Sequence, residues 1–208
     1  MTFKQLRRLW MVDLYRYTGE TSIKTLIKHV CFSDGNEHFS DGVKFSFHMR
    51  LCSYLSKATP KLLTLPFYFL CLSIFNHYKY KFGVWVAHST LIGEGFYIGH
   101  VGGIVVSDRA VIGKNCNISQ GVTIGASNRG GRKGTPIIGD NVYIGPGAKI
   151  FGAIRVGNNV AVGANCVVTT DVPDHAVIVG IPGKVISLEG STGYVNRKDY
   201  EDRTEEIA

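Results

Sequence analysis

An apolar residue recurs at every sixth position along residues 138–172 of this 208-residue chain. The members of this series are Ile138, Ile144, Ile150, Val156, Val162 and Val168. A second series lies four positions after each of them and holds small or β-branched residues and one cysteine: Val142, Ala148, Ile154, Val160, Cys166 and Val172. A period of six matches neither an α-helix nor a single strand, and it is typical of a solenoid of stacked short strands. One hexad cannot bury its apolar residue alone, so the sequence predicts a mainly β protein built around a parallel β-helix.

The same repeat begins earlier in the chain and is interrupted once. Its members are Ile92, Ile98 and Ile104, followed after a shift of two residues by Val106, Ile112, Ile118 and Ile124. Residues 125–136 are polar and glycine-rich, which predicts a loop extruded from the coil. We therefore expect a β-helix domain over residues 85–186. The charged residues 187–208 predict a C-terminal tail with little to bury.

Residues 1–84 lack the hexad pattern and favour a small α-helical N-terminal domain. Apolar spacing and helix boundaries predict helices over residues 3–17, 21–30, 43–55 and 62–78. The apolar run 62–75 is too short to span a membrane. Lysines flank this run, which allows peripheral membrane association, and protein core or a subunit contact is the alternative.

Composition narrows the classes of partner and of site. The net charge of +7 indicates either a solvated basic surface or an anionic partner such as a phosphate-bearing cofactor, and no Lys/Arg block is dense enough to indicate nucleic acid. Five cysteines without a Cys-x-x-Cys pair predict buried thiols in a reducing compartment. Residues 1–17 do not resemble a signal peptide, so we expect a cytoplasmic protein. No cluster has zinc-ligand spacing, and no metal is expected.

One histidine in the repeat has the position of a general base. His100 lies two residues after Ile98, at a corner between glycines, so its ring should point outward. An imidazole titrates near neutral pH and can accept a proton, although an ordinary exposed corner histidine is an equal alternative. Ser107 and Ser119 lack the Gly-x-Ser-x-Gly context of a nucleophile. The residues therefore favour direct transfer between two bound substrates over covalent catalysis.

Four stretches together resemble a known enzyme family. They are IGEGFYIGH (92–100), GVTIG (121–125), IGDNVYIGPGAKIFG (138–152) and VPDHAVIVGIPGKVI (172–186). They resemble the hexapeptide-repeat acyltransferases, especially the serine O-acetyltransferases and the related capsule and lipopolysaccharide O-acetyltransferases. The resemblance implies a left-handed β-helix, acetyl-CoA as donor, and a homotrimer with active sites between neighbouring solenoids. It also allows a dimer of trimers formed through the N-terminal helices.

The same resemblance implies roles for individual residues. His100 falls on the catalytic base, and a backbone N–H near Gly125 and Ala126 is expected to bind the oxyanion. The pantetheine arm is expected along the residues without bulk, which are Gly145, Pro146, Gly163 and Ala164. The candidate partners of the cofactor phosphates are Arg129, Arg132, Lys133 and Lys184, with solvated loop charge as an equal alternative for the first three.

The acceptor site departs from the serine enzymes. Gly99 stands where they have Asp, and Thr135 stands where they have a second His. Serine would lose its charged partners, so we expect a saccharide of capsule or O-antigen as acceptor, held against Phe96 and Tyr97. The alternatives are a serine O-acetyltransferase of cysteine biosynthesis and a non-catalytic trimeric scaffold.

Overall fold

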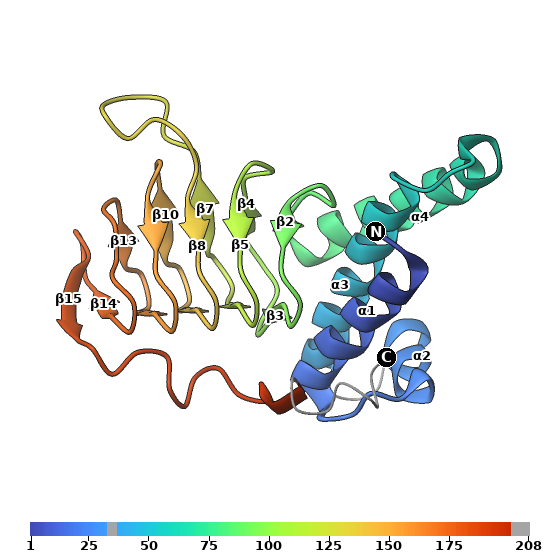
Figure 1. Ribbon diagram of the computed structural model, residues 1–208, viewed down its shortest axis with the longest axis horizontal. Helices are drawn as coiled ribbons and strands as arrows, with labels where there is room; N and C mark the ends of the chain where they lie inside the picture. The colour runs from blue at the N-terminus through green and yellow to red at the C-terminus, as the bar shows by residue number, and fades with distance from the viewer. Residues whose placement is uncertain (33–36, 201–208) are drawn as a thin grey trace.

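Four helices precede a solenoid of short strands in the computed structural model, which describes residues 1–32 and 37–200 (Figure 1). The helices are α1 (Phe3–Thr18), α2 (Ile23–Cys31), α3 (Glu37–Leu55) and α4 (Lys61–Phe82). Thr2 and Gln5 form a capping box that begins α1, and Gly83, with φ +61°, ends α4. The third helix begins at Glu37, earlier than the sequence predicted, because part of the polar stretch before residue 43 is helical.

The solenoid consists of three parallel sheets that each coil visits in turn. Its strands are β1 (Val84–Trp85), β2 (Leu91–Ile92), β3 (Tyr97–Ile98), β4 (Ile104–Val106), β5 (Val111–Ile112), β6 (Asn117–Ile118), β7 (Thr123–Gly125), β8 (Ile137–Ile138), β9 (Tyr143–Ile144), β10 (Lys149–Phe151), β11 (Arg155–Val156), β12 (Ala161–Val162), β13 (Val167–Val168), β14 (Val177–Val179) and β15 (Lys184–Ser187). Sheet 1 has the order β1-β4-β7-β10-β13, sheet 2 β11-β8-β5-β2, and sheet 3 β15-β14-β12-β9-β6-β3. Only the pair β14–β15 is antiparallel among these strands. The predicted mainly β fold, a parallel β-helix with a helical N-terminal domain, is confirmed.

Both hexad series point inward and form one continuous core. Each member of the two series from Ile138 to Val172 is at most 3% exposed. The shift of two residues in the repeat falls within β4, a three-residue strand whose ends, Ile104 and Val106, are both buried. The shift therefore costs no inward position, since alternate residues of a strand share a face.

The corner between sheets 2 and 3 carries a ladder of asparagines. Asn115, Asn141 and Asn159 all have φ between +54° and +57°, a conformation that asparagine tolerates better than most residues. The Nδ2 of Asn115 donates to Oδ1 of Asn141 at 3.0 Å, and the Nδ2 of Asn141 donates to Oδ1 of Asn159 at 3.0 Å. The Tyr200 hydroxyl donates to Oδ1 of Asn115 at 2.7 Å and closes one end of the ladder.

The first coil has no coil before it, and side chains of the helices take the place of one. Asp13 Oδ1 accepts hydrogen bonds from the backbone N–H of Gly95 at 2.9 Å and of Phe96 at 3.0 Å. Arg50 donates to the carbonyls of Ile92 and Gly93, both at 2.6 Å, and to the Asp13 carboxylate at 3.0 Å. Asp13 and Arg50 are 2% and 5% exposed, so this buried ion pair satisfies a strand edge that the solenoid leaves open.

The segment after β15 runs back along the solenoid to α1 (Figure 1). Its Tyr194 stacks on Tyr143 of sheet 3 with ring centroids 4.6 Å apart. Val195 and Tyr200 are buried, so the prediction of a tail with little to bury was wrong for residues 187–200. The charged residues of this segment suggested solvation, but its apolar and aromatic residues contact the rest of the protein. Residues 201–208 of the predicted tail lie outside the described residues.

Two smaller expectations concern membranes and thiols. None of the described helices is both long enough and apolar enough to cross a bilayer. Four of the cysteines are buried as expected, whereas Cys31, at the end of α2, is exposed.

Candidate functional site

His100 lies on the corner between sheets 3 and 1, in the turn that joins β3 to β4. Its side chain is exposed, as the hexad position predicted. Gly102 and Gly103, with φ of +112° and +65°, make the turn after it, and glycine takes such positive φ angles without the steric cost of a Cβ. The imidazole is therefore held at the surface by a turn in which Val101 packs against the core and the next two residues have no side chain.

Glycines continue this corner in the next coils. A Cβ on Gly103 would lie 3.6 Å from the Cα of Gly121, and a Cβ on Gly121 would lie 3.3 Å from the Cα of Gly147. Backbone therefore stacks directly on backbone, and the corner is a surface with few side chains. We call Gly103, Gly121 and Gly147, with the turn residues beside them, the glycine column.

The structure brings the four predicted pantetheine residues onto this same corner. Gly145 and Pro146 follow β9, and Gly163 and Ala164 follow β12, each pair in the turn that leads back to sheet 1. A Cβ on Gly145 would lie 2.9 Å from the backbone N of Ala164, so the two turns are in contact. Lys184 follows the Gly180–Gly183 turn. The backbone N–H of Gly183 donates to the carbonyl of Val167 on β13 at 2.8 Å, which places this turn at the last coil of the solenoid.

Lys149 lies beside the glycine column and was missed by the sequence reasoning. Its Nζ donates to the carbonyl of Gly121 and to Oγ1 of Thr123, the latter at 3.1 Å. The side chain is half-buried on β10, so it places a positive charge against the column. Its position one residue before Ile150 in the hexad predicts an outward side chain, which was a usable signal.

The extruded loop occupies a different corner, between sheets 1 and 2. It projects between β7 and β8 (Figure 1) and is closed by mutual hydrogen bonds of Ser127 and Gly134, at 2.9 and 3.0 Å. The backbone carbonyl of Arg132 accepts a hydrogen bond from the N–H of Ala153. The Arg132 guanidinium forms an ion pair with Asp171 at 2.9 Å. Arg129 and Lys133 are exposed. Arg132 is thus held over the following coils, whereas the other two loop cations lie in solvent.

The hydrogen bonds of Asp171 explain its acidity. Its pKa is lowered first by the backbone N–H of Arg155, which donates at 2.8 Å, and next by Arg132. The lowered pKa keeps the carboxylate charged, and able to pair with Arg132, further into the acid range than an ordinary aspartate. This pair fixes the base of the loop without contributing to the His100 corner.

One chain does not bring His100 together with the expected oxyanion donor. β7 crosses sheet 1 from the glycine column to Gly125 and Ala126 in three residues, which corresponds to about 10 Å. A Cβ on Gly125 would lie 2.4 Å from the ring of Phe151, so this glycine is needed for packing. His100 and the loop root therefore lie on two separate corners of one protomer.

The four predicted acceptor residues are also divided between corners. Gly99 lies next to His100, and a Cβ there would meet the Tyr97 ring at 3.5 Å. Thr135 lies at the loop root, where its hydroxyl donates to the Arg109 carbonyl at 3.0 Å. Phe96 is fully buried, so the prediction that it faces the acceptor was wrong. It lies four positions after Ile92 and therefore belongs to the second inward series.

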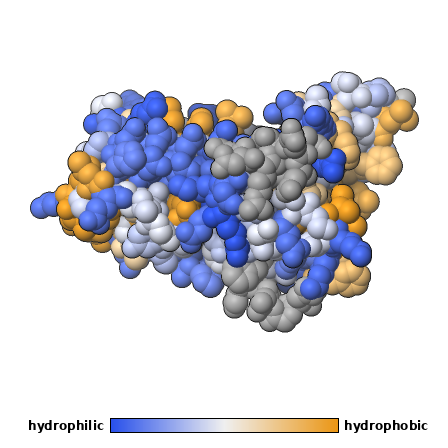
Figure 2. Space-filling view, turned by 60° about the horizontal axis from the view of Figure 1, so that its bottom comes forward, coloured by the Kyte–Doolittle hydropathy of each residue, from blue (hydrophilic) through white to orange (hydrophobic). Residues whose placement is uncertain are grey.

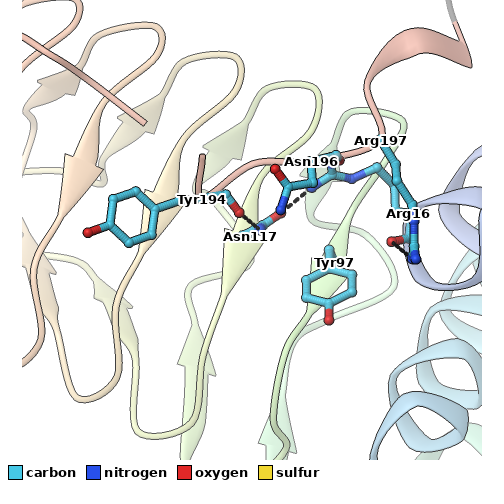
Figure 3. A pocket seen from close by; sticks show the side chains of 6 residues that line it. All are labelled: Arg16, Tyr97, Asn117, Tyr194, Asn196 and Arg197. Carbon is cyan, nitrogen blue, oxygen red and sulfur yellow. Dashed lines mark hydrogen bonds between the residues drawn. The ribbon is translucent and has the colours of Figure 1, made fainter. Parts of the chain in front are cut away.

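Tyr97 lines a cavity of about 260 Å³ between sheet 3, α1 and the C-terminal segment (Figure 3). The other lining residues are Arg16, Asn117, Tyr194, Asn196 and Arg197. Burial lowers the pKa of Arg16, and burial also raises that of Tyr97. No local sequence pattern predicts this cavity, because its walls come from α1, from sheet 3 and from the C-terminal segment, which lie far apart in the chain.

His88 is the second histidine of the first coil, and it is partly buried. Its Nε2 lies 3.2 Å from the Tyr68 hydroxyl, and burial lowers its pKa. Over residues 1–32 and 37–200, no group of three or more His, Cys, Asp or Glu side chains is arranged to hold a metal ion.

Comparison with known proteins gave one family and several relatives. The family described as bacterial transferase hexapeptide (six repeats) matches residues 135–170. A serine acetyltransferase of Synechococcus elongatus is 42% identical over 108 residues, which cover 52% of this chain and 44% of that protein. The chain spans about half the length of the curated relatives it matches.

Two solved structures extend the likeness to the helices. The serine acetyltransferase of Neisseria gonorrhoeae superposes with a TM-score of 0.67 at 30% identity, covering 93% of this chain and 71% of that one. A serine acetyltransferase in complex with CoA superposes with a TM-score of 0.63 at 27% identity, covering 88% and 70%.

Proposed function

The chain belongs to the bacterial hexapeptide-repeat transferases, and from this premise we propose that it transfers an acetyl group from acetyl-CoA to an acceptor hydroxyl. The observation that carries the proposal is the exposed His100 at the head of the glycine column. A base stands there beside a surface where an extended, narrow substrate can approach the backbone. The solved relative in complex with CoA supports the same donor.

The reaction that these groups favour is a direct transfer. The oxygen of the acceptor hydroxyl attacks the thioester carbonyl while His100 accepts the proton of that hydroxyl. The tetrahedral intermediate collapses, the C–S bond breaks, and the leaving thiolate takes the proton from His100. The backbone N–H groups at Gly125 and Ala126 are proposed to stabilise the oxyanion. Arg129, Arg132, Lys133 and Lys184 remain the proposed cation partners of the donor phosphates.

We propose a homotrimer in which neighbouring protomers complete one another's sites. Because His100 and the loop root lie about 10 Å apart along sheet 1, we propose that the loop of one protomer meets the His100 corner of its neighbour. Mixing two inactive variants tests this arrangement. A His100→Asn protein and a protein with residues 128–133 replaced by two glycines should each lack activity. Refolding them together should restore part of it, and no recovery would show that each protomer works alone.

The N-terminal part of α4, which exposes apolar residues on more than one side, is a candidate for a further contact between copies. Its exposed apolar residues are Leu63, Leu65, Phe67, Phe69, Leu70 and Ile74. An apolar patch of this kind marks an interaction surface, and we propose a contact that joins two trimers. Sedimentation with anionic liposomes distinguishes this contact from peripheral membrane association, in which the protein pellets with the vesicles.

The first acceptor to test is serine. The similar proteins are serine acetyltransferases. Phe96 is buried, so it cannot supply an aromatic face for a saccharide. A neutral saccharide remains the second candidate, because Gly99 and Thr135 supply no charge to pair with an amino acid.

One experiment tests the activity and the acceptor. Thiol release from acetyl-CoA is measured with serine and with a panel of neutral and acidic sugars, and the product is identified by intact mass. Serine turnover with kcat/KM above roughly 10⁴ M⁻¹s⁻¹ supports the serine assignment. Turnover of a sugar alone supports the saccharide, and absence of transfer to either class leaves the trimeric scaffold.

A further inference from the structure

The cavity beside Tyr97 contains a buried cation that has no anionic partner in the described part of the chain. Arg16 is 4% exposed, and its Nη1 and Nη2 donate to the Asn196 carbonyl and to Oδ1 of Asn117. Its Nε is buried and has no hydrogen-bond partner. Within the described residues, no carboxylate forms an ion pair with Arg16, and the oxygens around it are neutral. A buried guanidinium without a counter-charge is costly, which points to an anion that residues 1–32 and 37–200 do not supply.

A second arginine lines the same cavity. Arg197 is exposed, and its Nη1 donates to the carbonyls of Arg16 and Tyr17. These two contacts fix the position of the guanidinium while its remaining N–H groups make no hydrogen bond to the described chain. Two cations therefore face one space, and none of the described residues that line it is acidic (Figure 3).

The remaining walls suit a polar ligand. The side-chain amide of Asn117 is held by the Tyr194 carbonyl at 3.0 Å, and Asn196 also lines the space. The volume of about 260 Å³ exceeds by several times the roughly 30 Å³ that a water molecule occupies in the liquid. The cavity has room for an oxyanion and for a small organic body attached to it. Figure 2 shows that this side of the solenoid is largely hydrophilic, with hydrophobic side chains at the end of the solenoid that lies far from the helices.

We propose that Arg16 and Arg197 form a binding site for a small oxyanion, either a free phosphate or the phosphate group of a small metabolite. The two guanidiniums supply planar donors that match phosphate oxygens, and Asn117 and Asn196 add neutral partners. The lowered pKa of Arg16 agrees with a site in which the charge is desolvated before the anion binds. The anion joins α1, sheet 3 and the C-terminal segment, since the three elements each supply part of the wall.

The test is calorimetric titration of the full-length protein with inorganic phosphate, in the absence of any acyl donor. Wild type should bind one phosphate per chain, and its Tm should rise with phosphate concentration. Arg197→Gln should raise the Kd at least about tenfold, because one of two charge-assisted partners is lost. Arg155→Gln removes the same charge from an exposed position on sheet 2 and should leave the Kd unchanged.

Further arms separate the source of the anion and the location of binding. A hexose 1-phosphate that binds more than tenfold tighter than inorganic phosphate identifies a metabolite, and equal affinities identify the free ion. The neutral hexose should not bind. Absence of phosphate binding to wild type overturns the proposal. It is equally overturned if Arg197→Gln binds phosphate as well as wild type, or if Arg129→Gln in the extruded loop abolishes binding instead. Circular dichroism confirms that each variant is folded.

Discussion

An interior coil of the solenoid and its first coil satisfy the same backbone hydrogen-bonding requirement with different partners. In the interior, Asn117 N donates to the Val142 carbonyl and Tyr143 N to the Val160 carbonyl, each at 2.9 Å, so one coil binds the next. At the first coil, Asp13, Arg50 and Tyr17 of the helices replace the missing neighbour. The interior therefore depends on the shape of repeated apolar residues, whereas the first coil depends on a few charged and polar side chains from distant segments.

The interior is the region in which a single charge should have the largest effect. Ile138 is 2% exposed and its neighbour Ile137 is 48% exposed, because β8 points them to opposite faces. We expect Ile138→Asp to unfold the solenoid, since it buries a carboxylate without a partner. Ile137→Asp is the matched control and should keep the native far-UV circular dichroism. A folded Ile138→Asp protein with native Tm would contradict the inward column.

The junction should be the next most sensitive region. Asp13→Ala leaves Arg50 buried without its partner and frees two backbone N–H groups, which should lower the free energy of unfolding by about 3–5 kcal/mol. Hydrogen exchange at the amides of Gly95 and Phe96 should accelerate before exchange in the interior coils does. Glu94→Gln, at a more exposed ion pair with Arg8, should lower stability less. Equal losses for the two variants would show that the junction is not held by the buried pair.

The His100 corner belongs to neither kind of region, and its variants should affect activity without affecting stability. His100→Asn should reduce kcat on the order of 10²–10⁴-fold, the range for a lost general base, with Tm nearly unchanged. His175→Asn changes another exposed histidine of the solenoid and serves as the control. A His100→Asn enzyme that keeps more than about a third of wild-type activity would remove His100 from the mechanism.

The smallest effect is expected at the base of the loop. Arg132→Gln should raise the pKa of Asp171 only part of the way to its ordinary value, because the stronger contribution, the Arg155 N–H, remains. Because the pKa of Asp171 is lower in the folded protein, ionised Asp171 stabilises the fold. This stabilisation is fully present above the ordinary pKa of about 4 and disappears as pH falls through the folded pKa. NMR titration of the Asp171 carboxyl measures the shift. An unchanged pKa would show that the ion pair does not form in solution.

The sequence predicted the repetitive part of this molecule well because the repeat and the core are the same feature. The hexad frame identified every inward residue from Ile138 to Val172, and the same frame places Phe96 inward, where the acceptor prediction had neglected it. His100 was found at an exposed corner for the same reason. Its catalytic role, like the roles of the loop cations, remains a prediction.

The junction and the cavity could not be predicted in this way. The partners of Asp13 include backbone N–H groups more than 80 residues away, which have no sequence signature. The charges of the C-terminal segment suggested solvation, although Val195 and Tyr200 were an apolar signal for packing. Such contacts depend on where a single segment returns to the body, and no periodicity encodes that position.

The return of the C-terminal segment to α1 gives the fold an unusual order of completion. Tyr15 and Asp199 are hydrogen-bonded at 2.9 Å although 184 positions separate them, and Arg197 reaches the end of the same helix. The parallel strands of each coil pair only with the coils next to it in sequence, so the coils can form soon after they leave the ribosome, whereas the face of α1 around Arg16 stays open until the last coils have been synthesised. The helix made first is therefore enclosed last, and contacts of high sequence separation are concentrated at one point of an otherwise local topology.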